Sequence, residues 1–260
     1  MTVEKNYEFR KYLNVVHHAD RRNESAKLKS REIEIQNGWS VIVDRNASPV
    51  IINAAKDLLD YLFTSMNVSV MLKKTDTLPE TIAIERNCII LGTKKELQQI
   101  GNVLNVPNSY LLNCGKDRIC ICGNEDRGTA QGCYYLEDLM NLREAPFLKV
   151  GNFKREPLFS PRMVHSGWGM DQFPDGHLNA IAHVGMDAIL VFTKDVDTTT
   201  IGYLDFNELI ERAASYGIDV YIYSYIKSLK HPSKKMPRNT MRAPTENCSR
   251  HAPRQKESSL

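Results

Sequence analysis

The clearest hydrophobic pattern in the chain lies between residues 50 and 66, in the sequence VIINAAKDLLDYLFTSM. Its apolar residues recur at helical spacing and predict a helix with one buried face. These residues are Ile51, Ala54, Ala55, Leu58, Leu59 and Leu62. Before the helix, EIEI and WSVIV flank Asn37-Gly38, which predicts a two-residue β-hairpin. After it, VSVML and NCIILG predict two strands, and a short helix is expected within residues 94–104.

A second hairpin is predicted by SYLLNC and RICICG, which flank Gly115-Lys116. Residues 123–132 then join this hairpin to the helical pattern CYYLEDLMNL. A glycine-bearing turn at the start of a helix can present backbone amides to an anion. However, the glycine spacing matches neither a P-loop nor a dinucleotide-binding fingerprint. We therefore favour the alternative, in which Gly128 and Gly132 let the helix lie close against the sheet.

The pattern changes across residues 147–161, which are rich in proline and glycine and predict a domain boundary. Beyond it, PRMVHSG, MDAILVF and IDVYIYSYI predict strands that alternate with the helices DGHLNAIAHVG and YLDFNELIERAASYG. Helices that end in glycine before an apolar strand are typical of parallel βαβ units. We expect an α/β fold, with an α+β accessory domain containing a mixed sheet and then an incomplete (β/α)8 barrel. Three strands cannot close a barrel that needs eight.

Residues 227–260 have neither helical nor strand periodicity. They contain nine Lys and Arg against two Asp and Glu, which leaves 25 against 29 in residues 1–226. Three explanations are open: out-of-frame translation of a gene whose barrel continues, an inert terminus, or a basic arm that binds nucleic acid. We favour the first, because codons allowed from Lys235 onward encode a helix-like and then a strand-like stretch in a shifted frame. Nucleic acid is not expected, since this segment has no aromatic residue to stack on bases.

The predicted organisation has four parts: a polar N-terminal arm (1–30), the accessory α/β domain (31–154), the first barrel strands (155–226) and a basic disordered tail (227–260). No stretch is apolar enough to span a membrane, and the start lacks the core of a signal peptide, so a cytoplasmic protein is expected. The cysteines lie mostly in apolar runs without a CxxC motif, which favours core packing over zinc binding. His17 and His18 are adjacent and point different ways on a helix or strand, so metal binding is not expected there. No metal and no cofactor are expected for the chain.

Residues 32–145 resemble the small α/β domain that precedes the barrel in bacterial β-N-acetylhexosaminidases of glycoside hydrolase family 20 and in α-glucuronidases. The resemblance rests on VIINAAKDLLDYL, CIILG, RICICG and above all EDRGTAQGCYYLEDLM. Residues 156–226 are similar to the opening strands of the barrel that follows. The resemblance implies an enzyme that hydrolyses O-glycosyl bonds, with an acetamido group of the substrate as nucleophile and an Asp-Glu pair after the fourth strand. That pair has no counterpart here, so we expect an N-terminal fragment without catalytic residues, and a carbohydrate as its partner.

The resemblance places Arg162 where the family holds sugar hydroxyls, and an arginine fork suits that role. His165, Trp168 and Asp171 follow the same predicted strand, on the loop side where barrel sites form, so all four are candidate substrate-binding residues. Each also has a structural alternative. Arg162 would form an ion pair with an acidic residue between the domains. Trp168 would pack in the domain interface, and His165 would be a packed, hydrogen-bonded histidine. His177 and His183 are expected to be structural or solvated. The rival function is a non-catalytic carbohydrate-binding or protein-interaction module; the oligomeric state is left open.

Overall fold

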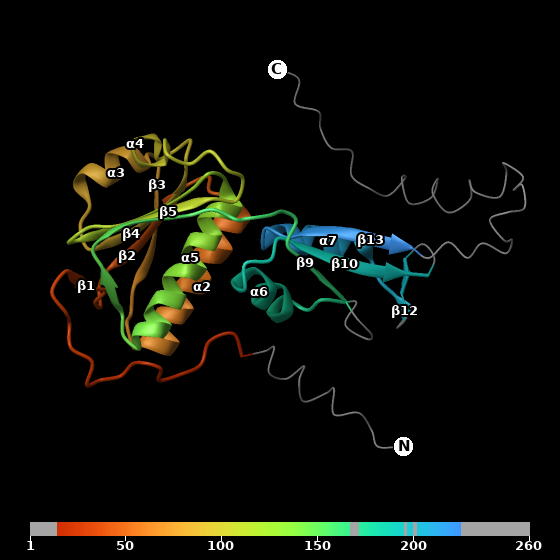
Figure 1. The fold of residues 1–260 in the computed structure, drawn as a ribbon, viewed down its shortest axis with the longest axis horizontal. Coiled ribbons are helices and arrows are strands. Elements are labelled where there is room, and N and C mark those ends of the chain that lie inside the picture. Colours follow the sequence, from red (N-terminus) through yellow and green to blue (C-terminus); the bar gives the residue numbers. More distant parts are fainter. Residues whose placement is uncertain (1–14, 167–171, 195–196, 200–201, 225–260) are drawn as a thin grey trace, which may run out of the picture.

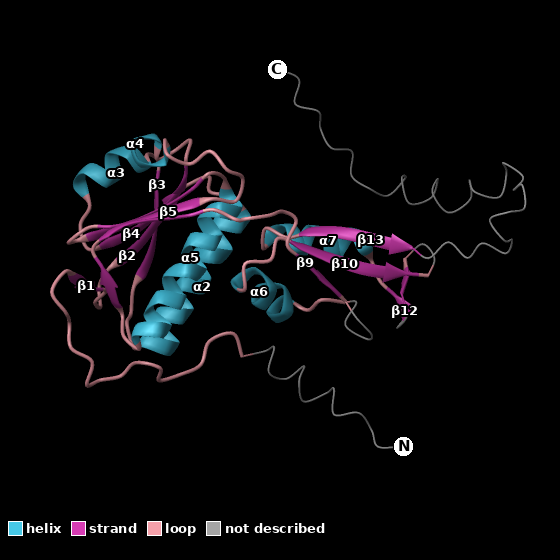
Figure 2. Cartoon of the chain, viewed as in Figure 1, coloured by secondary structure: helices cyan, strands magenta, loops and turns pink. Residues whose placement is uncertain are grey.

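The protein is described by a computed structural model that covers residues 15–166, 172–194, 197–199 and 202–224. These residues form two lobes, a larger one built on a mixed sheet and a smaller one built on parallel strands (Figure 1). Helices and strands alternate along both lobes (Figure 2), which confirms the predicted α/β class. Trp168, Asp171, the tail and the first 14 residues lie outside the described ranges.

A six-stranded sheet organises the larger lobe, with strand order β3-β2-β4-β6-β5-β8. The pairs β2–β3, β2–β4 and β4–β6 are parallel, whereas β5 is antiparallel to both β6 and β8. The β5–β6 pairing confirms the second predicted hairpin. The strands are β2 (Ser40–Asp44), β3 (Met71–Thr75), β4 (Cys88–Thr93), β5 (Tyr110–Cys114), β6 (Arg118–Gly123) and β8 (Gly151–Arg155).

Helices cover both faces of this sheet. The long helices α2 (Pro49–Met66) and α5 (Asp126–Arg143) lie side by side on one face, and α3 (Leu78–Ile84) and α4 (Gln98–Gly101) lie on the other (Figure 1). Alternate residues of β4 therefore enter two different cores: Ile89 and Leu91 on the α2 side, Cys88 and Ile90 on the α3 side. This double coverage explains why the strand is apolar throughout.

Helix α2 confirms the predicted periodicity. Ser48 caps its first turn by accepting a hydrogen bond from the Ile51 amide, and Pro49 occupies the first position, where no amide is needed. Asn67, in a left-handed conformation, ends the helix. Five of the six predicted core residues are buried, and Leu59 is partly buried against the same core.

The Asn37-Gly38 hairpin prediction is wrong. Strand β1 (Glu32–Glu34) pairs with β7 (Phe147–Lys149), whereas β2 joins the main sheet. Both Asn37 and Gly38 instead bind Ser69: the Ser69 amide donates to Asn37 Oδ1 at 2.7 Å, and the Gly38 amide donates to the Ser69 carbonyl at 3.0 Å. The turn thus directs the chain from one sheet to another, and its local sequence carries no information about the distant partner β7.

The smaller lobe contains three parallel strands in the order β13-β10-β9, joined by helices α6 and α7. Gly185 and Gly217 follow the two helices, as predicted from the sequence, and both have a positive φ. Contacts of α6 with α5 and of α7 with α2 attach this lobe to the larger one. The elements are β9 (Met163–His165), α6 (Asp175–His183), β10 (Ala188–Thr193), β11 (Thr198–Thr199), β12 (Gly202–Tyr203), α7 (Phe206–Ser215) and β13 (Asp219–Ser224).

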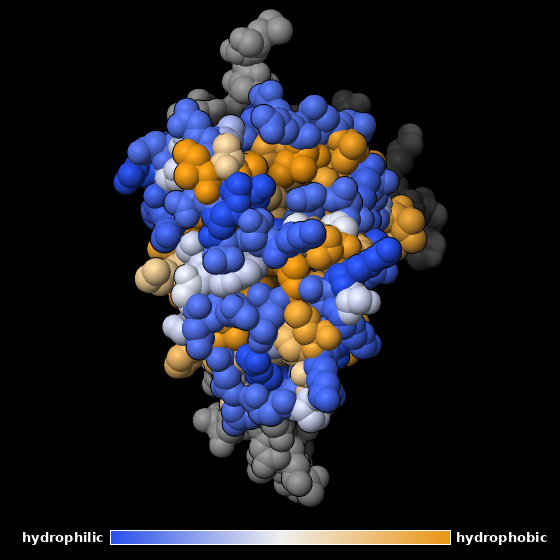
Figure 3. All heavy atoms as spheres, turned by 90° about the vertical axis from the view of Figure 1, so that its left-hand side faces the viewer, coloured by the Kyte–Doolittle hydropathy of each residue, from blue (hydrophilic) through white to orange (hydrophobic). Residues whose placement is uncertain are grey.

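Residues 15–31 contain no helix or strand and pass the C-terminal ends of α2 and α5 (Figure 1). The Arg21 amide donates to the Ser65 carbonyl at 3.0 Å, and the Asn23 amide donates to the Glu144 carbonyl at 2.7 Å. This described part of the predicted arm is therefore attached to the larger lobe. Figure 3 shows the face of the larger lobe that points away from the smaller one, where hydrophilic side chains surround several apolar areas.

Candidate functional site

Arg162 immediately precedes β9 and pairs with Asp187, which immediately precedes β10. The Arg162 amide donates to Asp187 Oδ1 at 2.5 Å, and its guanidinium lies 3.4 Å from Oδ2. The Asp187 side chain is 1% exposed and also accepts from Asn108 at 3.3 Å. The loss of hydration of a buried carboxylate must be offset by ion pairs and hydrogen bonds of this kind. Because Asn108 belongs to the larger lobe, the arrangement matches the structural alternative for Arg162, an ion pair at the junction of the lobes.

His165 is the last residue of β9, so it lies at the opposite end of this strand from Arg162. Its side chain is exposed, and its ring makes an edge contact with Phe192 at 5.9 Å between centroids. Phe192 makes a similar contact with Tyr223 at 5.6 Å. This aromatic row crosses the three parallel strands on the face that a closed barrel would enclose. The structure therefore separates Arg162 from His165, and it places His165 at the carboxyl end of β9, where barrel sites form.

A cleft of about 300 Å³ lies at the junction of the lobes, at the amino end of β9 and β10. The Arg155 guanidinium lies over the Tyr135 ring, 4.8 Å from its centroid. Burial raises the pKa of the Asp138 carboxyl group, which also lines the cleft. Aromatic rings and charged groups of this kind suit small polar ligands. The residues around it are Asn108, Tyr110, Gln131, Tyr134, Tyr135, Asp138, Arg155, Glu156, Pro157, Arg162, His183, Val184 and Gly185. The cleft is at the end of the strands opposite to the usual catalytic end of a barrel.

A buried polar cluster, formed by His17, Asp57, Glu137 and His183, lies between the helices near this cleft. His183 Nε2 is 2.7 Å from Asp57 Oδ2, and His17 Nε2 is 3.2 Å from Asp57 Oδ1. His183 is thus packed and paired, in line with the structural reading of it. Sequence reasoning missed the cluster, although a carboxylate on the buried face of a helix, as at Asp57 and Glu137, is a signal that could have indicated it.

The remaining predicted residues have structural surroundings. The ring of His177 stacks on Phe173 at 5.1 Å, and burial lowers the pKa of this histidine. Five cysteines are buried and free, and burial raises their pKa values, to about 11 for Cys120 and about 12 for Cys122. Thiols of this kind are packing groups and poor nucleophiles. Within the described residues, no helix has the length and apolarity needed to cross a membrane.

Comparison of the sequence with protein-family models and with curated proteins gives no match. Comparison of the fold with solved structures finds similar proteins. A family GH115 4-O-methyl-α-glucuronidase with specificity for decorated arabinogalactans is 12% identical, with a TM-score of 0.52 over 72% of this chain and 29% of its own. The GH20 β-N-acetylhexosaminidase from Streptomyces coelicolor A3(2) is 15% identical, with a TM-score of 0.53 over 78% of this chain and 45% of its own. A mutant Streptomyces plicatus β-hexosaminidase in complex with its product is 14% identical, with a TM-score of 0.52 and the same coverage.

A further similar structure is a GH138 enzyme that targets pectin rhamnogalacturonan II, at 14% identity and a TM-score of 0.50 over 73% of this chain and 31% of its own. The chain spans less than half the length of each of these four structures. At such identities the likeness concerns the fold alone. The chain has a glycoside-hydrolase-like α/β fold.

Proposed function

We propose that the chain forms the accessory domain and first barrel strands of a glycoside hydrolase, and that it contributes carbohydrate contacts from the carboxyl end of β9. One observation carries this proposal: a six-stranded mixed sheet is followed in the chain by the parallel strands β9, β10 and β13, and this fold is similar to that of enzymes from three glycoside hydrolase families. The finer proposal is a β-N-acetylhexosaminidase-like parent enzyme.

The proposed sugar contacts are His165, Trp168 and Asp171, which follow one another at the end of β9 in sequence. Trp168 supplies a ring for one face of a pyranose, and His165 and Asp171 supply hydrogen bonds to hydroxyls. Arg162 enters the proposal in another role, since it is engaged with Asp187 at the other end of the strand. It holds β9 against the start of β10.

Binding of N-acetylglucosamine and of glucuronic acid to the full chain, measured by isothermal titration calorimetry, tests the proposal. We expect Trp168→Ala and His165→Ala each to weaken binding about tenfold, which corresponds to about 1.4 kcal/mol. His18→Ala, at another exposed histidine, is the matched control and should bind as the unaltered chain does. Unchanged binding by Trp168→Ala, or no binding of any sugar in a wider panel of monosaccharides, would refute the proposed contacts.

The fragment is proposed to be inactive by itself, because the acid pair implied by the resemblance follows a fourth barrel strand. We therefore expect no release of p-nitrophenol from p-nitrophenyl N-acetyl-β-glucosaminide. Release above that of a buffer control, with loss of the signal in His165→Ala, would show that the chain is itself an enzyme.

A protein-interaction module is the second candidate, and the open face of the parallel strands favours it. Met163, Tyr221 and Tyr223 on this face are 36%, 44% and 43% exposed, although they are large and mainly apolar. Contiguous exposed apolar groups mark association surfaces. Light scattering after size-exclusion chromatography tests this candidate: a stable dimer that Tyr221→Lys disrupts supports it, and a monomer that still binds sugar supports the carbohydrate proposal.

A further inference from the structure

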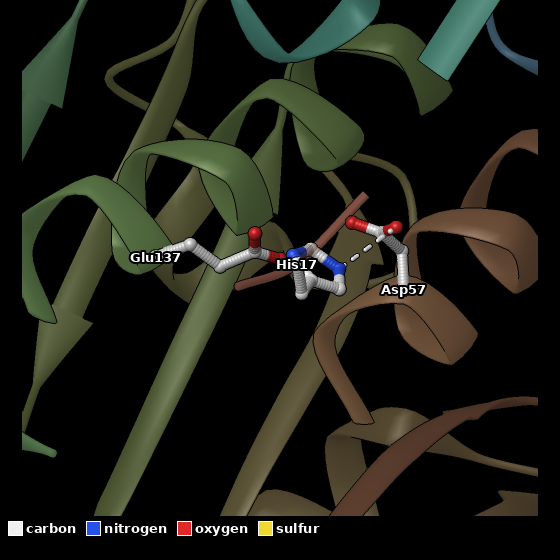
Figure 4. Close-up of side chains that lie close together, drawn as sticks. All are labelled: His17, Asp57 and Glu137. Carbon is white, nitrogen blue, oxygen red and sulfur yellow. Dashed lines mark hydrogen bonds and ion pairs between the residues drawn. The ribbon is translucent and has the colours of Figure 1, made fainter. Parts of the chain in front are cut away.

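The buried polar cluster brings together residues from parts of the chain that are far apart in sequence. His17 belongs to the N-terminal segment, Asp57 to α2, Glu137 to α5 and His183 to α6. Figure 4 shows the His17 ring between the Asp57 and Glu137 carboxyl groups, which approach it from the two facing helices. One ligand atom from each of these three residues lies within 4.8 Å of the other two.

We propose that His17, Asp57 and Glu137 bind one divalent transition-metal ion, with zinc as the best-suited ion. A tetrahedral zinc ion, at about 2.0–2.2 Å from nitrogen and oxygen ligands, separates those ligands by about 3.4 Å. The 3.2 Å between His17 Nε2 and Asp57 Oδ1 is already close to that separation. The imidazole nitrogen makes calcium or magnesium a poor fit, since these ions prefer all-oxygen sites.

An unpartnered oxygen independently indicates a missing ligand. Among the residues that the structure describes, none gives Glu137 Oε1 a hydrogen bond, and the whole Glu137 side chain is only 2% exposed. A buried acceptor without a hydrogen bond destabilises the folded state. A divalent ion bound here would supply a partner for this oxygen, and its charge would balance both carboxylates.

Two residues of α6 hold the proposed ligand Asp57 in place by hydrogen bonds. His183 Nε2 lies 2.7 Å from Asp57 Oδ2, and Asn179 Nδ2 donates to Asp57 Oδ1 at 2.9 Å. Such contacts orient a ligating carboxylate, and metal sites commonly have them. Because His183 and Asn179 belong to α6, an ion at this site would join the N-terminal segment, the two long helices and the smaller lobe. The proposed role of the ion is therefore to hold these segments together.

Metal analysis of the full chain tests the proposal. The protein is stripped with a chelator, loaded with zinc chloride alone, dialysed, and analysed for zinc by mass spectrometry and for thermal unfolding by circular dichroism. We expect about one zinc ion per chain and a higher unfolding temperature, since an ion bound only to the folded state stabilises it. His17→Gln and Glu137→Gln should lose both effects. His18→Gln changes the neighbouring, exposed histidine and should keep both.

Zinc bound elsewhere is distinguishable from zinc at this site. Residues 227–260 contain His231, Cys248 and His251, which could hold zinc without help from the helices. Zinc that survives in His17→Gln and in Glu137→Gln would overturn the proposal, and so would cobalt binding with a thiolate charge-transfer band. Failure of the unaltered chain to retain zinc, or to gain stability from it, would also overturn it and leave a carboxyl pair that shares a proton. If Glu137→Gln does not fold, His17→Gln in the peripheral segment still decides the question.

Discussion

A methyl group at Gly128 should destabilise the protein, although alanine is the better helix former. A Cβ at this position would lie 2.4 Å from the Ser109 backbone oxygen and 3.2 Å from the Gly123 Cα. Carbon and oxygen atoms normally approach to about 3.3 Å, so α5 would have to move by about 1 Å from the sheet. Overpacking of this kind costs up to about 3 kcal/mol, whereas replacing glycine in a helix returns at most about 1 kcal/mol. We expect Gly128→Ala to lose about 2 kcal/mol.

Gly132 offers a matched comparison on the same helix. There a Cβ would lie 2.4 Å from Ile121 Cγ2, a side-chain atom that can move, whereas the obstacle at Gly128 is backbone. Gly132→Ala should therefore lose less, about 1 kcal/mol. In an Ile121→Ala background the added methyl group enters the space vacated by the side chain, so the loss should shrink or reverse.

Urea unfolding followed by far-ultraviolet circular dichroism measures both variants. A lower midpoint with an unchanged slope indicates a change in stability alone. Gly128→Ala as stable as the unaltered chain, or more stable, would refute the reasoning. It would mean that helix propensity, and not the close approach of α5 to the sheet, decides the residue at this position. Equal losses for Gly128→Ala and Gly132→Ala would contradict the distinction between backbone and side-chain obstacles.

Three further outcomes follow from the described contacts. Asp187→Asn should lower the free energy of unfolding by about 3 kcal/mol in a urea titration, because it leaves Arg162 without its buried partner; an unchanged midpoint would contradict this. Glu32→Gln should destabilise at pH 7, since the hydrogen bond from Arg143 lowers the pKa of Glu32 in the folded state. The contribution of Glu32 is complete above its unfolded-state pKa of about 4.3 and disappears as the pH falls through the lower folded-state value, so the variant and the unaltered chain should converge in acid. In a Cys248→Ser variant, Ellman's reagent should label no thiol until urea is added, because all five remaining cysteines are buried.

The elements that were predicted well are those whose partners are close in sequence or whose burial shows in the periodicity. Helix α2 carries its capping serine and its buried face within one stretch. The β5–β6 hairpin pairs neighbouring strands, and the close packing at Gly128 and Gly132 follows from glycine at two positions of one helix. Each of these features depends on local information. The short helix α3 was not predicted, because Leu78 is its only buried residue and leaves no apolar periodicity.

The features that were not predicted depend on contacts across long separations. Strand β1 pairs with β7 in a register that sets Ile33 opposite Leu148, and nothing near Asn37-Gly38 indicates that partner. The pairing of Arg162 with Asp187 depends on the parallel register of β9 and β10, which places the starts of both strands side by side. Arg162 and His165 are apart because Arg162 precedes the first residue of β9 and His165 is its last. A sequence pattern indicates that two residues share a strand. It does not indicate which residues of other strands lie beside each end of that strand.

The lobes are distinct in topology but share one core. Strand β8 belongs to the six-stranded sheet and β9 to the parallel one, yet a single apolar cluster contains Leu58 of α2, Ile181 of α6 and Leu209 of α7. Helices α2 and α5 therefore have two buried faces, one against the six-stranded sheet and one against α6 and α7. A helix buried on two sides has little solvent-facing surface for polar groups. The carboxylates of Asp57 and Glu137 consequently lie inside the molecule, where they need partners, and this explains why histidines from the N-terminal segment and from α6 converge on them.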